Sequence, residues 1–128
     1  MNTSDFVSEF EAYALLARAG LRPPRYGVAG GNLPFAPGEP VVVKGLRENV
    51  WHKSELGAVH FLPFEPQTVF EEFKGMYARI EATGHRWLDG LVCEQIDIAR
   101  SPHLPSEALV SLTRGEAGWT IVCGFGGL

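Results

Sequence analysis

The chain has 128 residues, of which 45% are hydrophobic and 20% are charged, and its formal net charge is −4. This length corresponds to one ordinary domain, and the composition is typical of a protein with a folded core. The acidic balance argues against a dedicated nucleic-acid binder, because affinity for a phosphate backbone requires a basic surface. No stretch approaches the roughly 20 apolar residues of a membrane span, and the N-terminus is acidic, unlike a signal peptide.

The two cysteines, Cys93 and Cys123, lie far apart in apolar surroundings, without a CxxC pair or a nearby cluster of histidines. This pattern favours buried free thiols in a reducing compartment. We therefore expect a cytoplasmic protein that associates with neither nucleic acid nor a membrane.

The first half of the chain predicts the order helix, strand, strand, helix. Residues 4–19 have apolar side chains at helical spacing, with Ser4 as the expected N-cap, and residues 27–40 are expected to form a loop rich in glycine and proline. A β-branched run at 41–43 indicates a strand covered on both faces, and residues 58–62 indicate a second strand. Pro66 is expected in the first turn of a helix that ends at Gly84.

The second half predicts a third strand at residues 91–93, a polar loop at 97–106, and a hairpin. The hairpin would pair residues 108–112 with 119–123 across a short glycine-rich spacer. The whole order is typical of an α+β fold. The chain ends in a glycine-rich tail directly after a strand, and we expect this tail to lead into a longer unit.

The residue types suited to binding phosphate are concentrated in PVVVKGLRENVWHKSELGAV, residues 40–59. Lys44 follows the apolar run and is either a cation for nucleotide phosphates or a lysine leaving the core for solvent. His52, Lys53 and Ser54 precede Gly57, and they form either a phosphate-contacting loop or an ordinary solvated one. The P-loop pattern GxxxxGK[ST] is absent from the sequence.

Polar residues at the ends of the later strands are weaker candidates. Glu94 and Gln95 follow the third strand, and Glu107 opens the fourth. Each has a side chain able to hydrogen-bond an adenine edge or a ribose hydroxyl, and each is equally consistent with an ordinary strand-end residue. The other histidines, at positions 60, 85 and 103, lack metal-ligand spacing, so the sequence predicts no metal site.

Taken together, these segments resemble the front of the ATP-grasp domain of ADP-forming acyl-CoA synthetases, the acetate–CoA ligase family related to the β subunit of succinyl-CoA synthetase. PVVVK at 40–44 resembles the family's PVVLK, and HKSELGAV at 52–59 resembles HKSDVGGV. LVCEQI at 91–96 resembles VLVQEM, and FGGL at 125–128 resembles GLGGI. The resemblance implies an ATP-grasp N-terminal lobe, a helix-backed small mixed sheet, at residues 1–96. Residues 97–128 would then be a hinge loop and the first hairpin of the second lobe.

The resemblance also implies a function: acid, CoA and ATP would give acyl-CoA, ADP and phosphate through a phosphohistidine. His52 would be the catalytic phosphoryl carrier, and ATP with Mg²⁺ would be the bound nucleotide. Its contacts would come from the following residues: Lys44, Lys53, Ser54, Gly57, Glu94, Gln95 and Glu107. The family's Mg²⁺ ligands and its CoA-binding domain or subunit are expected outside this chain.

The sequence departs from the family pattern at three places. Cys93-Glu94-Gln95 replaces Val-Gln-Glu, residues 97–106 are longer than the usual hinge, and Ala58 replaces a loop glycine. Two alternatives therefore stay open beside the ligase. One is a non-catalytic nucleotide-binding or regulatory module derived from the grasp fold, and the other is a structural interaction domain without a ligand. Self-association into a homo-oligomer is a further expectation, through an apolar edge.

Overall fold

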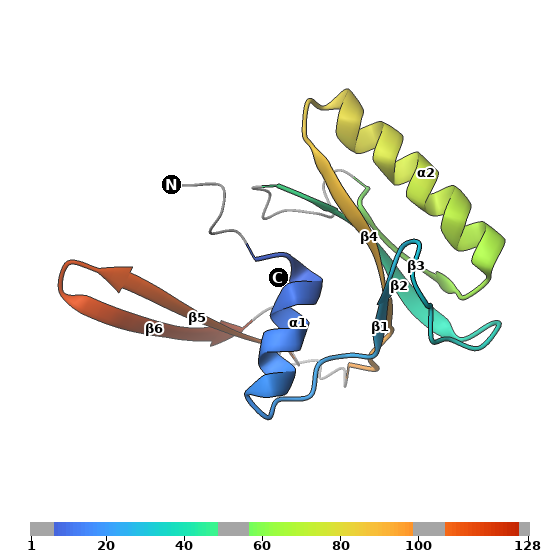
Figure 1. The fold of residues 1–128 in the computed structure, drawn as a ribbon. Coiled ribbons are helices and arrows are strands. Elements are labelled where there is room, and N and C mark those ends of the chain that lie inside the picture. Colours follow the sequence, from blue (N-terminus) through green and yellow to red (C-terminus); the bar gives the residue numbers. More distant parts are fainter. Residues whose placement is uncertain (1–6, 49–56, 99–106, 126–128) are drawn as a thin grey trace. The chain divides into compact units, whose positions relative to one another are not determined.

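The computed structural model describes residues 7–48, 57–98 and 107–125 (Figure 1). The chain divides into two compact units, Met1–Gln95 and Ile96–Leu128. The first unit contains two helices and four strands, in the order α1 (Glu9–Arg18), β1 (Tyr26–Val28), β2 (Pro40–Arg47), β3 (Val59–Pro63), α2 (Pro66–Ala82) and β4 (Trp87–Glu94). The second unit contains β5 (Ala108–Gly115) and β6 (Gly118–Phe125). The expected α+β class is confirmed.

The four strands of the first unit form one sheet in the order β1-β4-β2-β3. Every pairing in this sheet is antiparallel, so the expectation of a mixed sheet is wrong. β1 overlaps the start of residues 27–40, which the sequence predicts as a loop, and it pairs with the second half of β4. The central strands β2 and β4 are eight residues long. Most of β2 is buried, as the apolar run at 41–43 predicts, and the second half of β4 is largely buried.

Helix α1 begins later than its apolar periodicity suggests. Its N-cap is Ser8, whose side chain accepts a hydrogen bond from the Glu11 N–H, while the Glu11 carboxylate accepts one from the Ser8 N–H. This reciprocal capping box fixes the first turn. The expected cap, Ser4, lies outside the described residues. The helix has no fully buried residue, so its attachment to the sheet depends on partly buried side chains.

The two faces of the sheet have separate apolar clusters, because alternate residues of a strand point to opposite sides. On one face, Val41, Val43 and Val92 pack with the α2 side chains Val69, Phe73 and Met76. On the other face, Leu46, Leu91 and Cys93 pack with Phe10 and Tyr13 of α1. Figure 1 shows α2 and α1 on opposite sides of this sheet.

Two glycines let α2 approach the sheet closely. Gly45 of β2 and Gly90 of β4 are direct partners in the ladder. A Cβ at Gly90 would lie 2.5 Å from the Phe73 ring, and one at Gly45 would lie 2.8 Å from the Trp87 ring. The aromatic side chains therefore occupy the space that larger residues in the strands would need.

The second unit contains an antiparallel hairpin, as predicted, with strands longer than expected. Its eight residue pairs run from Ala108↔Phe125 to Gly115↔Gly118. One face is strongly apolar and includes Val110, Leu112 and Ile121, all of them exposed. Cys123 lies on this face and is exposed, so the expectation of two buried thiols is wrong for this residue, whereas Cys93 is buried. Both cysteines are free.

Candidate functional site

Lys44 lies inside β2 rather than at its end, because the strand continues to Arg47. Its neighbours Val43 and Gly45 face α2, so the Lys44 side chain lies on the α1 face of the sheet, opposite Leu91 of β4. There its ammonium donates a hydrogen bond to the Glu9 carboxylate and forms an ion pair with it. The Lys44 and Glu9 side chains are only 22% and 19% exposed, so this pair is partly shielded from water.

Glu9 belongs to a small polar network between α1 and the sheet. The Tyr13 hydroxyl donates to Glu9 Oε1 over 2.6 Å, and the same oxygen accepts from Lys44. Tyr13 Oη also lies 3.7 Å from Cys93 Sγ, close enough for a weak hydrogen bond. Burial raises the pKa of Tyr13 well above its ordinary value of 10.0, and the hydrogen bond to Glu9 raises it further. The tyrosine therefore stays protonated and donates its hydroxyl hydrogen bond to Glu9.

The segment that contains His52, Lys53 and Ser54 joins β2 to β3. These three residues lie outside the described residues. The ends of the segment are anchored: Lys44 pairs with Val59 in the ladder, and Gly45 N donates to Ala58 O over 2.8 Å. Lys44 thus lies near the base of the connection that would form the phosphate loop.

Gly57 closes this connection against α2. Its φ of +60° is a left-handed conformation that favours glycine. Its carbonyl accepts a hydrogen bond from Arg79 Nη2 over 2.9 Å, and an added Cβ would lie 3.3 Å from Arg79 Nε. The left-handed backbone and the close contact with Arg79 therefore account for a glycine at position 57.

Glu94 ends β4, and it is engaged by Arg25. The Arg25 N–H donates to Glu94 Oε1 over 2.9 Å, and the Arg25 guanidinium lies between Glu94 and Glu39. Strand alternation puts Glu94 on the opposite face of the sheet from Lys44, since its ladder partner is Val41. The structure therefore brings Lys44 together with Glu9, and it separates the Glu94 side chain from both. Gln95 follows the strand, and its N–H donates to Pro40 O.

Glu107 belongs to the second unit, immediately before β5, and is exposed. Arg114, further along β5, lies with its guanidinium carbon 5.7 Å from the Trp119 ring centroid, a cation–π contact across the hairpin.

Three residues with well-defined contacts were not selected from the sequence: Glu9, Tyr13 and Arg25. Glu9 and Tyr13 are four residues apart on an amphipathic helix, so their mutual contact follows from helical spacing. The contact of Glu9 with Lys44 joins residues 35 positions apart and has no local signal. Arg25 follows two prolines, a context that indicates only extended backbone.

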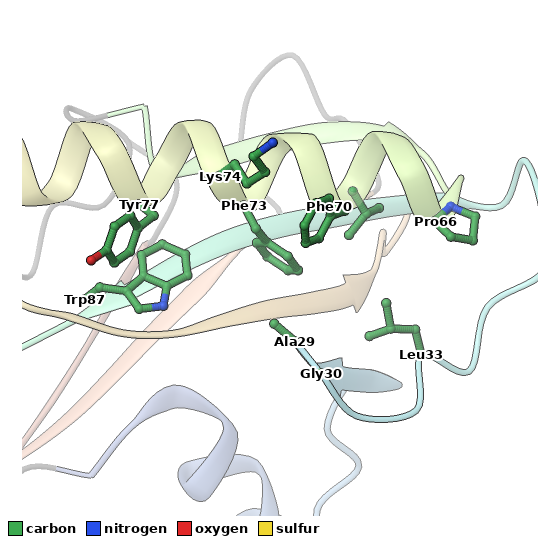
Figure 2. Close-up of a pocket in the computed structure, with 10 residues that line it drawn as sticks. Ala29, Gly30, Leu33, Pro66, Phe70, Phe73, Lys74, Tyr77 and Trp87 are labelled. Carbon is green, nitrogen blue, oxygen red and sulfur yellow. The ribbon is translucent and has the colours of Figure 1, made fainter.

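A groove of about 620 Å³ lies on the other face of the sheet, between α2 and the turn after β1. Figure 2 shows Phe73 and Tyr77 of α2 beside Trp87 of β4, Phe70 further along the helix, and Ala29, Gly30 and Leu33 opposite. Phe70 and Tyr77 are 56% and 51% exposed. Lys74, also from α2, is the only charged side chain among the described lining residues.

The remaining histidines with described positions do not gather. His60 Nδ1 lies 2.5 Å from Glu72 Oε2, and His85 is exposed, whereas His103 lies outside the described residues. Within residues 7–48, 57–98 and 107–125, no group of three or more potential ligands could hold a metal ion. In the same ranges, no helix is long and apolar enough to cross a membrane.

Comparison with known proteins gives one result at the level of the fold. No family model and no curated protein matches the sequence. The crystal structure of PH1788 from Pyrococcus horikoshii Ot3 is similar, with a TM-score of 0.71 and 20% sequence identity. The match covers 95% of this chain and 53% of that chain, so this chain spans about half its length. The name of that protein states no activity, and the likeness concerns the fold alone.

Proposed function

We propose that the chain is the ATP-binding part of an ADP-forming acyl-CoA synthetase-like ligase, built on the N-terminal part of an ATP-grasp domain. The observation that best supports this proposal is the position of Lys44. Its ammonium lies on the α1 face of the sheet, beside the apolar cluster of Leu46, Leu91 and Cys93. Its ladder partner Val59 begins β3, shortly after the connection that contains His52-Lys53-Ser54.

Lys44 would contact a phosphate of the nucleotide as a point charge. An ammonium has three donors, and a charge-assisted contact to phosphate is roughly twice as strong as a neutral hydrogen bond. The side chain is 22% exposed, so such a contact would be less screened by salt than one at the surface. Lys53, Ser54 and Gly57 would complete the phosphate contacts from the loop.

His52 would accept the phosphoryl group. In the step proposed, a ring nitrogen of His52 attacks the terminal phosphorus of ATP, a nitrogen–phosphorus bond forms, and the bond to the bridging oxygen breaks to release ADP. The phosphohistidine then passes its phosphoryl group to the acid, and CoA displaces phosphate from the acyl phosphate. Splitting the transfer in this way replaces one difficult step with easier ones.

The rest of the site would come from the strand ends and from outside the chain. Gln95, which follows β4, would border the adenine, whereas the Glu94 side chain lies on the opposite sheet face from Lys44 and is left out of the proposed site. Mg²⁺ would enter with the nucleotide, and its protein ligands would lie outside this chain. The partner would be a CoA-binding domain or subunit, and the protein would act in the cytoplasm. Because the Mg²⁺ ligands and the CoA-binding part would lie outside these 128 residues, we expect little or no turnover from them alone.

Calorimetric titration with Mg-ATP and Mg-ADP tests this proposal. Lys44→Ala should weaken binding by about 1–3 kcal/mol, the usual cost of losing a hydrogen bond to a charged group. Lys74→Ala is the matched control, because Lys74 is an exposed lysine on the α2 face and should leave the affinity unchanged. Equal affinities for the Lys44→Ala variant and the natural chain would contradict the proposal.

A second candidate function is a regulatory module without ligase chemistry, and the groove over α2 favours it. Its volume lies within the range of small-molecule sites, and its described lining is mainly apolar, with four aromatic rings and one lysine. Complementarity to Lys74 and to the flat rings would select a planar apolar molecule that bears a negative charge.

Fluorescence titration with anilinonaphthalene sulfonate, a planar apolar anion, tests this second candidate. Phe70→Ser and Lys74→Gln should each weaken binding of the dye, whereas Phe61→Ser should not, because Phe61 is 67% exposed on β3 and lies outside the groove. The hairpin is the same in all variants, so the differences report on the groove. Equal titrations for all four proteins would reject the groove as a site for such ligands.

A further inference from the structure

We infer that Glu9 blocks the phosphate site by occupying Lys44, so that the Glu9–Lys44 ion pair is an autoinhibitory contact that a nucleotide must displace. This inference rests on the proposed function, because it concerns the same phosphate site. The carboxylate and the ammonium are in direct contact, and each side chain is about one-fifth exposed. A phosphate that approaches Lys44 therefore meets a lysine whose charge is already neutralised.

The negative charges of Glu9 and of the phosphate decide whether Lys44 contacts both groups together or exchanges Glu9 for the phosphate. Lys44 has three donors, so geometry alone would permit it to contact Glu9 and a phosphate together. The phosphate chain and the Glu9 carboxylate are both negative, however, and at such short range in a partly shielded site they repel each other strongly. The stable arrangement is one in which the phosphate replaces the carboxylate on the ammonium.

The surroundings of Glu9 allow it to leave. Tyr13 donates to the same Glu9 oxygen, so the carboxylate keeps a hydrogen-bond partner when Lys44 turns to a phosphate. Both residues belong to α1, whose start is fixed by the Ser8–Glu11 capping box and which has no fully buried residue. A helix with its own cap and only partly buried attachments can shift as a unit at low cost.

Titration of the 128-residue chain and its Glu9→Gln variant with Mg-ATP tests this inference. Glutamine has nearly the same shape and can still accept from Tyr13, but it removes the competing charge. We expect the Glu9→Gln variant to bind Mg-ATP more tightly, by roughly two- to fivefold, which is the affinity equivalent of an exposed salt bridge. Glu71→Gln is the matched control, since it removes the same charge from α2, where Glu71 contacts the exposed Lys74 and Gln67.

A second readout separates displacement from a general change in charge. In the natural chain, Mg-ATP should speed amide hydrogen exchange in α1, and this effect should be absent from the Glu9→Gln variant. The gain in affinity should also disappear when Lys44→Ala is present. Lys44-dependent binding with no gain in the Glu9→Gln variant would overturn the inference and leave the proposed function standing. Absence of binding by every variant would overturn both.

Discussion

Gly90→Ala tests whether α2 is positioned over the sheet as described, because the substitution adds one methyl group beneath Phe73. The new Cβ would lie 2.5, 2.7 and 2.8 Å from three carbons of that ring. Ordinary contact begins near 3.4 Å, so the ring would have to retreat by about 0.9 Å (3.4 − 2.5). Phe73 is only 9% exposed and lies within the apolar cluster under α2, so its retreat disturbs packed neighbours.

The expected cost follows from two opposing effects. Overpacking of a core costs about 1–3 kcal/mol. Replacing glycine by alanine restricts the unfolded chain and returns about 0.4–1 kcal/mol. We therefore expect Gly90→Ala to lower the free energy of unfolding by about 1–2 kcal/mol. In a unit of this size, each kcal/mol lowers Tm by roughly 4–8 °C.

Urea denaturation followed by circular dichroism measures this change, and two further variants control it. Gly124→Ala lies in β6 with no heavy atom within 4 Å of its new Cβ, so it should leave the unfolding midpoint nearly unchanged. Phe73→Leu combined with Gly90→Ala should cost less than the sum of the single changes, because the smaller side chain makes room. A Gly90→Ala variant as stable as the natural chain would refute the packing of Phe73 on this strand.

Three further predictions concern individual side chains. Tyr13→Phe should lower the free energy of unfolding by about 1 kcal/mol in thermal melts, because the hydroxyl that donates to Glu9 is lost; an unchanged Tm would contradict the network. Arg47→Met should be neutral or stabilising in urea, because Arg47 is 3% exposed and its Nε and Nη1 have no hydrogen-bond partner among the described residues; a large loss would contradict this expectation. The N–H of Thr68 lowers the pKa of Glu65, the N-cap of α2, below its ordinary value of 4.5, so this carboxylate stabilises the fold above pH 4.5 and loses that effect as the pH falls further. Glu65→Gln should therefore be less stable than the natural chain at pH 7, with a gap that narrows below pH 4.5; a gap independent of pH would contradict the cap.

Most of the secondary structure could be predicted from the sequence, because it depends on local patterns. Pro66 begins α2, apolar residues spaced along that helix face the sheet, and the spacer before Gly118 turns the hairpin. β1 could not be predicted in the same way. It has only three residues in a region of glycine and proline, and it forms because β4, more than 60 positions later, offers a free edge.

The position of Lys44 shows a second kind of limit. A charged residue after three valines suggests the end of a strand, yet β2 continues for three more residues. It continues because Gly45 fits beneath α2 and Leu46 packs into the cluster on the α1 face. The charge of Lys44 is accommodated by Glu9 from a distant helix. Contacts of this kind depend on the assembled fold. No pattern among neighbouring residues in the sequence therefore predicts the Glu9–Lys44 ion pair or the separation of Lys44 from Glu94.

The central claim is that a nucleotide binds on the α1 face of the sheet, at Lys44. Amide NMR spectra of the 128-residue chain, recorded during titration with Mg-ATP, test it most directly. The account predicts that the resonances that move will cluster at Lys44, Leu91 and Cys93 and in the connection that contains His52, and that Phe70 and Tyr77 in the groove will stay unchanged. Shifts confined to the groove, or the same shifts in the Lys44→Ala variant, would contradict it.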